Sequence, residues 1–288
     1  MTRVKIVSVI VLVALVGSAQ AQQRPPLAPQ PSAPQPPATT PQAPAPTSQP
    51  PATTPPQLAA TSDIEPGAMA ALDRMGAYLR SLKAFQVEAV TTKEDVLTDG
   101  QKIQLAGVVN LVARMPDRLR IETANDRHER LYLYNGKQFT VWARRMNYYA
   151  TVPAPPTITQ LTDVLEARYD LEVPLVDLFR WGTKGRTGSG IKAAMDVGPS
   201  QVGGTTCEHY AFRQDDVDWQ VWIQKGDFPL PRKLVITTMT DPARPQASAT
   251  YTWNLAPSMN DAAFTFDPPT DAKRIRLAEV APAAGGGK

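Results

Sequence analysis

The sequence predicts an α+β fold in which a strongly curved, open antiparallel β-sheet, a half-barrel, is wrapped over helices. Three observations predict it. Apolar residues first recur at helical spacing near residue 70, they alternate with polar residues in two later stretches, and helical spacing returns between those stretches. Neither set of strands has enough helix to cover it alone, so we expect both sets in one continuous sheet.

The chain begins with the pattern of a secretory signal peptide, which we place at residues 1–21. Arg3 and Lys5 form a charged start, Ile6–Val16 is apolar, and Ala19-Gln20-Ala21 resembles a cleavage site. The alternative is an uncleaved membrane anchor, but a run of about 11 residues is short of the ~20 that cross a bilayer. We therefore expect a periplasmic protein with no stable membrane span after cleavage.

The next segment, residues 22–65, is rich in Pro, Ala, Gln and Thr, and no aromatic residue precedes Tyr78. Such a composition cannot bury enough apolar surface to offset the entropy of ordering the chain. We expect a disordered linker there, a folded domain over residues 66–280, and a disordered tail over residues 281–288.

The domain is predicted to open with a helix. Ser62 or Asp63 can cap it, Pro66 suits its first turn, and apolar residues recur three and four residues apart up to Leu82. Period-two alternation then predicts strands, with Asn135-Gly136 as the strongest hairpin turn. The first set of strands spans residues 85–92, 102–113, 118–123, 129–135 and 138–143.

Helical spacing returns between Ile158 and Trp181, in two short segments separated at Pro174, which we expect to cover one face of the sheet as a lid. A glycine-rich stretch from Gly182 to Gly190 is predicted to be a mobile loop. Asp261–Phe264 is predicted to be a short turn. The second set of strands spans residues 193–197, 205–214, 218–224, 231–240, 247–255 and 264–267.

Several functions lack the residues they need. The formal net charge is +3, removal of Arg3 and Lys5 leaves about +1, and the remaining charges alternate in sign, which disfavours nucleic-acid binding. The chain has two histidines and one cysteine, and no HExxH, GxSxG or CxxC motif. We expect no catalytic residues, no metal and no cofactor.

One arrangement of residues invites a catalytic interpretation. Cys207 and His209 alternate on a predicted strand and therefore share one face, as a thiol nucleophile or half a metal site would require. Residues two apart on a strand lie ~6.5 Å apart, and neither a third ligand nor an orienting carboxylate is identifiable. We interpret the pair as ordinary packing.

An ordered series of segments carries a family resemblance over roughly residues 66–280. The segments are SLKAFQVEA, GVVNLVARMPDRLRIE, ERLYLYNGKQFTVW, DWQVWIQKGDFPLPRKLVIT and DAAFTFDPP. Together they resemble the periplasmic lipoprotein-carrier superfamily of the LolA/LolB type, and more closely an uncharacterised predicted periplasmic family built on that fold. The resemblance implies an apolar cavity between a curved sheet and its helices.

The sequence departs from this pattern at one turn. In the carriers an arginine directly precedes the strand-end proline and takes part in closing the lid, whereas here Met115 precedes Pro116 and the nearest basic residue is Arg114. These three residues are the lid and turn candidates. Because fold does not fix function, the cargo can differ while the fold is kept.

We expect a soluble binding protein or carrier for a hydrophobic ligand, such as a lipid, an acyl chain or a lipoprotein. The alternative is a cell-envelope protein-protein interaction module on the same fold, in which the same apolar residues make a filled core and an envelope protein is the partner. The candidate cavity residues are Val109, Leu111, Leu133, Phe139, Val141, Trp142, Leu165, Leu178, Phe179, Trp222 and Val235.

Overall fold

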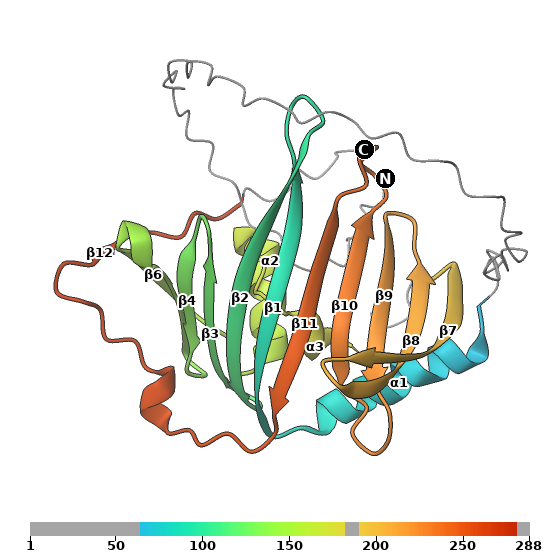
Figure 1. Ribbon diagram of the computed structural model, residues 1–288. Helices are drawn as coiled ribbons and strands as arrows, with labels where there is room; N and C mark the ends of the chain where they lie inside the picture. Colours follow the sequence, from blue (N-terminus) through green and yellow to red (C-terminus); the bar gives the residue numbers. More distant parts are fainter. Residues whose placement is uncertain (1–63, 182–189, 281–288) are drawn as a thin grey trace, which may run out of the picture. The chain divides into compact units, whose positions relative to one another are not determined.

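A computed structural model describes residues 64–181 and 190–280 of the chain. Its main feature is a 12-stranded sheet with the strand order β12-β6-β5-β4-β3-β2-β1-β11-β10-β9-β8-β7. The sheet is open and curved, and the helices lie against one of its faces (Figure 1). The predicted fold class, an open antiparallel sheet wrapped over helices, is confirmed.

Apart from strands β6 and β12, the helices and strands follow the predicted order. The helices are α1 (Pro66–Ser81), α2 (Ile158–Tyr169) and α3 (Asp177–Arg180), with short 3-10 helices at η1 (Arg144–Met146) and η2 (Asp261–Phe264). The strands are β1 (Ala84–Val96), β2 (Lys102–Arg114), β3 (Arg118–Asn125), β4 (Glu129–Tyr134), β5 (Gln138–Ala143), β6 (Tyr148–Pro153), β7 (Ala193–Val202), β8 (Thr205–Arg213), β9 (Val217–Gln224), β10 (Pro231–Thr238), β11 (Gln246–Asn254) and β12 (Lys273–Arg274).

Helix α1 begins later than the expected cap. Its N-cap residue is Glu65, without a side-chain capping bond, so the assignment of Ser62 or Asp63 is wrong. Pro66 takes the first helical position, where its missing N–H costs nothing because that group has no partner within a helix. The apolar side of α1 is buried in the core through Ala68, Ala71, Leu72, Met75 and Leu79.

Strand β1 joins the two sets of strands. It pairs with β2 on one side and with β11 on the other, so that Val87 lies opposite both Leu111 and Trp253. This pairing brings together segments more than 150 residues apart and confirms the expectation of one continuous sheet.

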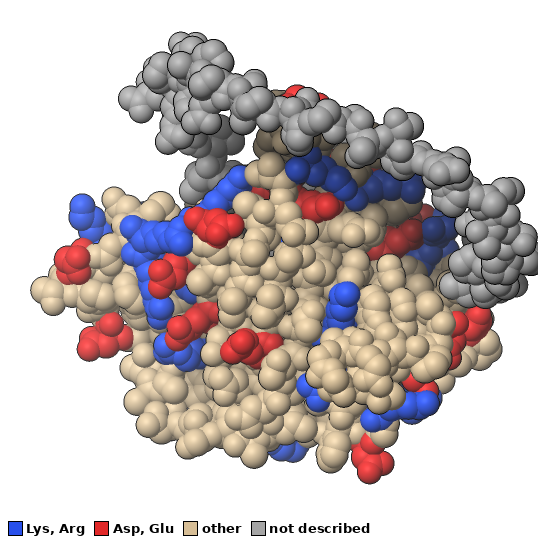
Figure 2. Space-filling model, in the orientation of Figure 1, with Lys and Arg blue, Asp and Glu red and all other residues tan. Residues whose placement is uncertain are grey.

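The two faces of the sheet differ in what covers them. On the inner face, side chains such as Val87, Leu111 and Leu234 join those of the helices in one hydrophobic core. On the outer face, Val90 and Val108 lie opposite one another and remain 55% and 44% exposed. Charged side chains gather toward the rim of this outer face and are sparse over its middle (Figure 2).

The structure departs from the predicted elements at three places. Strand β6, Tyr148–Pro153, was not predicted, and it pairs with β5. The predicted strand at residues 264–267 is wrong, because Phe264 ends the 3-10 helix η2 and the next residues are irregular. A short strand, β12, follows instead and runs parallel to β6. The predicted glycine-rich loop lies almost entirely outside the described residues.

Candidate ligand-binding site

Helices α2 and α3 cover the inner face of the sheet where the resemblance places a cavity. Thr157 caps α2, since its Oγ1 accepts a hydrogen bond from the Gln160 N–H at 3.3 Å. The Ile158 N–H donates to the Pro116 carbonyl oxygen at 2.8 Å, which ties the start of α2 to the turn between β2 and β3. This first-turn N–H has no partner within the helix, so the turn satisfies it.

Most of the predicted cavity residues are brought together on this inner side. Strand residues face the helices there, and helix residues face the strands, all within one hydrophobic cluster. The rings of Phe85 and Phe179 lie 6.0 Å apart between centroids and connect β1 to α3. The predicted residues on this side are Val109, Leu111, Phe139, Val141, Leu165, Leu178 and Phe179.

The remaining predicted cavity residues, Leu133, Trp142, Trp222 and Val235, lie on the outer face, so their assignment to the inner cavity is wrong. The pairing register shows why. Leu133 lies opposite Thr140, and Trp142 opposite Tyr149, whereas the inner positions of these strands belong to neighbouring residues. Side chains on a strand alternate between faces, so a residue one position away from the core faces outward.

Trp222 and Val235 lie on the outer face of β9 and β10. The Trp222 ring stacks on that of His209 at 3.9 Å between centroids, and Lys233 Nζ lies 4.8 Å from the Trp222 ring centre. Val235 lies opposite Gln220 and Ser248. The inner positions of β9 are Val217, Trp219, Val221 and Ile223.

The lid and turn candidates point to different surroundings. Arg114 pairs with Asp261 and lies 5.5 Å from the centre of the Phe264 ring, so it holds the C-terminal segment on the outer face. Met115 packs partly buried against the core. Pro116 contacts α2 through its carbonyl oxygen. Of the three, Met115 and Pro116 therefore lie beside the helical cover, and Arg114 does not.

Asp177 is the polar residue of the inner interface that sequence reasoning missed. Its side chain is 5% exposed, and its Oδ2 has no hydrogen-bond partner. Burial raises the pKa of Asp177 to about 7, although the charge of Arg180 opposes this. The sequence does contain a sign of this buried carboxyl group, because Asp177 is the one charged residue between Val173 and Phe179.

Tyr251 on β11 lies within electrostatic range of Asp177. Burial raises the pKa of Tyr251, and the Asp177 charge raises it further. Arg180 pairs with Glu166 at 2.5 Å and so links α3 to α2. Among the described residues the inner interface is thus mainly apolar, and it contains one carboxyl oxygen, Asp177 Oδ2, without a hydrogen-bond partner.

The cysteine and the histidine of β8 lie on the outer face. Cys207 is fully buried, and burial raises the pKa of its thiol, which disfavours the reactive thiolate. The His209 Nε2 and the Gln220 Oε1 lie 3.0 Å apart in a hydrogen bond. These contacts agree with the interpretation of both side chains as packed residues.

Two wider features can be stated for the described part of the chain. Among residues 64–181 and 190–280, no three His, Cys, Asp or Glu side chains cluster closely enough to hold a metal ion. Within the same ranges, no helix is long and apolar enough to cross a membrane.

Solved structures with a similar arrangement come from several bacteria. An uncharacterized conserved protein from Thermus thermophilus is 13% identical with a TM-score of 0.42, the match covering 73% of this chain and 99% of that one. The lipoprotein LppX from Mycobacterium tuberculosis is 10% identical with a TM-score of 0.36, covering 68% and 100%. A LolA superfamily protein from Nitrosomonas europaea is 11% identical with a TM-score of 0.34, covering 69% and 97%.

These structural likenesses are too distant to bear on what the chain binds. No curated protein matches the sequence. A family described as "Predicted periplasmic protein (DUF2092)" does match it, over residues 68–278, which is nearly all of the described domain. The chain belongs to this family of predicted periplasmic proteins.

Proposed function

We propose that this chain is a periplasmic binding protein or carrier for a hydrophobic ligand, such as a lipid, an acyl chain or a lipoprotein. The ligand occupies the interface between the inner face of the sheet and helices α2 and α3. In this proposal residues 1–21 direct export and are removed, residues 22–65 are a linker, residues 66–280 form the binding domain and residues 281–288 are a tail. The protein acts by binding and not by catalysis.

The observation that carries the proposal is the Asp177 Oδ2, a buried oxygen without a hydrogen-bond partner in a mainly apolar interface. A buried polar atom without a hydrogen-bond partner costs about 1–3 kcal/mol, so folded proteins rarely keep one without a reason. A ligand with a hydroxyl or amine group beside an apolar chain supplies the missing donor. Ligand sites of this kind have mostly apolar walls with a few polar groups that fix orientation.

The way the helices are held supports entry of such a ligand. Apolar contacts between Leu165, Phe179 and the strands are not directional, so an apolar chain can replace them without leaving polar groups unsatisfied. The hydrogen bond from Ile158 to Pro116 and the one from Arg80 to the Trp181 carbonyl oxygen lie at opposite ends of the cover. These two bonds hold the ends of the cover, while the packing between them is mainly apolar.

The second candidate, an envelope interaction module, is supported by the packing of the same interface. Leu111, Leu165 and Phe139 are almost completely buried, as they are in a filled core. In this case the outer face, where Val90 and Val108 are exposed, meets the envelope partner. The two candidate functions differ in whether the protein binds an apolar molecule.

Native mass spectrometry with lipid extraction, on protein purified from the periplasm without detergent, separates the two. We expect a bound lipid or acylated peptide, and uptake of a fluorescent fatty acid by protein stripped of it. Leu165→Trp, which fills the inner interface, should reduce uptake at least fivefold, whereas Val235→Trp adds bulk to the outer face and should not. Repeated recovery of empty protein without fatty-acid uptake would refute the carrier and favour the interaction module.

A further inference from the structure

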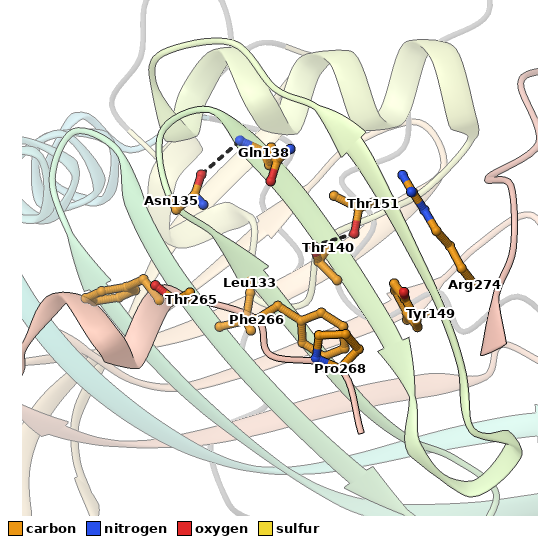
Figure 3. A pocket seen from close by; sticks show the side chains of 11 residues that line it. Leu133, Asn135, Gln138, Thr140, Tyr149, Thr151, Thr265, Phe266, Pro268 and Arg274 are labelled. Carbon is orange, nitrogen blue, oxygen red and sulfur yellow. Dashed lines mark hydrogen bonds between the residues drawn. The ribbon is translucent and has the colours of Figure 1, made fainter. Parts of the chain in front are cut away.

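A second concave site lies on the opposite face of the sheet from the proposed ligand interface. It is a pocket of about 290 Å³ over strands β4, β5 and β6, bounded by the chain segment that follows η2 and by β12 (Figure 3). Its lining residues are Leu133, Asn135, Gln138, Thr140, Tyr149, Thr151, Phe264, Thr265, Phe266, Pro268 and Arg274. A pocket of this volume suits a small molecule, since it falls at the lower end of the usual range for ligand sites.

Hydrogen bonds fix the segment that bounds the pocket at both ends. At η2, the Asn260 Oδ1 accepts a hydrogen bond from the Ala263 N–H at 3.1 Å, and Arg120 donates to the Ala263 carbonyl oxygen at 3.2 Å. At β12, the Ile275 N–H donates to the Tyr149 carbonyl oxygen at 2.8 Å. The pocket is therefore held open by the fold, so a ligand need not order it.

Several polar groups of the pocket can donate hydrogen bonds to a ligand. The Asn135 Oδ1 already accepts from the backbone N–H groups of Lys137 and Gln138 at 3.1 and 2.9 Å, which leaves its amide hydrogens to donate. Thr140 and Thr151 share one hydrogen bond of 2.9 Å between their hydroxyls, so one hydroxyl hydrogen of the pair stays free. A ligand in contact with these groups can therefore accept hydrogen bonds from them.

The pocket also has a single charge. Arg274 is its only ionisable lining residue besides Tyr149, and none of the lining residues is a carboxylate. No ion pair joins Arg274 to another residue of the described part of the chain. An arginine without an acidic partner attracts an anion, and its planar guanidinium pairs with a carboxylate through two parallel hydrogen bonds.

One wall of the pocket is aromatic. The rings of Tyr149 and Phe266 lie 5.1 Å apart between centroids, and Trp142 lies 5.9 Å from Phe266 on the same face. Figure 3 shows Tyr149, Phe266 and Pro268 on one side and Asn135, Gln138 and Thr140 along β4 and β5. Rings in this arrangement favour a flat or apolar group on the ligand.

We propose that this pocket binds a small organic carboxylate that has an aromatic or apolar group. The carboxylate pairs with Arg274 and accepts a hydrogen bond from the Thr140-Thr151 pair. The apolar group lies against Tyr149 and Phe266. This site is separate from the inner interface and does not depend on the hydrophobic ligand proposed there.

Titration of the purified full chain with 3-phenylpropionate, followed by backbone and methyl NMR shifts, tests the proposal. Shifts are expected at Thr140, Thr151 and Arg274. The uncharged analogue 3-phenylpropionamide has the same shape without the charge and should bind at least tenfold more weakly. Sulfate, which has charge without the ring, should also bind at least tenfold more weakly.

Two matched variants decide the role of the arginine. Arg274→Gln should weaken 3-phenylpropionate binding at least tenfold, while Arg276→Gln, which changes the same residue type two positions away and outside the pocket, should change it less than twofold. Unchanged NMR shifts outside the pocket will show that both variants fold. Equal binding of acid and amide, sulfate binding as tight as that of the acid, no binding in the millimolar range, or an unaffected Arg274→Gln would each overturn the proposal.

Discussion

Phe85 on β1 and Phe179 on α3 lie with their ring centroids 6.0 Å apart, and Phe85 also lies 5.5 Å from Trp253 on β11. This group of rings connects the middle of the sheet to its helical cover. Because β1 holds the two sets of strands together, the same contact links all three parts of the domain.

Removal of the Phe179 ring should therefore destabilise the whole domain. Phe179→Ala is expected to lower the free energy of unfolding by about 3 kcal/mol, the usual loss when a buried phenylalanine leaves a cavity. Urea denaturation followed by circular dichroism measures it. Phe228→Ala is the control, because Phe228 is 52% exposed and its loss should cost about 0.5 kcal/mol or less. Equal losses in the two variants would contradict the packing role of Phe179.

The buried carboxyl of Asp177 should make stability depend on pH. Burial raises the pKa of Asp177 from 3.8 to about 7, so the unfolded chain releases this proton at lower pH than the folded chain does. A rise in pH from about 4 to 7 therefore lowers the free energy of unfolding. Above about pH 7 this decrease stays constant, because Asp177 is then ionised in both states. Asp177→Asn should match the parent near pH 4 and be more stable by on the order of 2–4 kcal/mol at pH 8.

The comparison that isolates this effect is the difference between variant and parent at each pH, since other groups titrate in both. Asp73→Asn, at an exposed position of α1, is the control for the loss of one carboxylate from the chain. If Asp177→Asn is less stable than the parent at pH 8, the carboxylate has a partner that satisfies it.

The C-terminal segment should stabilise the outer face of the sheet through Phe264. This side chain is 1% exposed beneath Arg114 and beside Leu133, although it lies far from the inner core. Phe264→Ala is expected to cost about 3 kcal/mol, whereas Thr265→Ala, which changes an exposed neighbour, should cost about 0.5 kcal/mol or less. Thermal unfolding of both variants measures the difference. Similar melting temperatures for Phe264→Ala and the parent would show that this contact of the C-terminal segment does not stabilise the domain.

The order of most elements could be predicted from the sequence, because each of these has a clear local pattern. Pro66 and the apolar spacing after it define α1, and the alternation of DWQVWIQ defines β9. The continuity of the sheet could also be predicted, because neither set of strands had a cover of its own. The pairing of β1 with β11 was a consequence of that argument.

The face of each strand was harder to predict, because some strands are apolar on both faces. In β4 the run Leu131, Tyr132, Leu133 and Tyr134 is entirely buried, since the core covers one face and the C-terminal segment covers the other. In β9 the tryptophans at 219 and 222 are three residues apart and must face opposite ways. Alternation alone does not show which of them joins the core, and the pairing register decides it.

The polar features of both sites depend on long-range contacts that no local pattern contains. The pocket on the outer face needs Thr140 from β5 and Arg274 from β12, which meet only because β12 pairs with the unpredicted strand β6. The lack of a hydrogen-bond partner for Asp177 Oδ2 likewise depends on the packing of α3 near β11. A charged residue within PLVDLF was visible in the sequence, but its missing partner was not.

The pKa of His209, whose ring stacks on that of Trp222 on the outer face, should depend on the charge of Lys233. Burial lowers the pKa of His209, and the charge of Lys233 lowers it further, while the hydrogen bond with Gln220 opposes both. Lys233→Gln removes the charge and should therefore raise the pKa of His209. NMR titration of the histidine ring measures it, with Lys102→Gln on a distant hairpin as the control. No change with Lys233→Gln would contradict the proximity of the two groups.

The hairpin between β4 and β5 should require glycine at position 136. Gly136 has φ of 85°, and a Cβ atom there would lie 2.7 Å from the Asp117 Oδ2. Gly136→Ala is therefore expected to lower the free energy of unfolding by about 1–2 kcal/mol, because both the backbone conformation and the space favour glycine.

Gly67→Ala is the matched control, since Gly67 lies in the first turn of α1 with nothing within 4 Å of an added Cβ. Alanine is the better helix former, so this variant should be as stable as the parent or up to about 1 kcal/mol more stable. Chemical denaturation compares the two variants, and a loss in Gly67→Ala equal to that in Gly136→Ala would show that the turn does not select glycine.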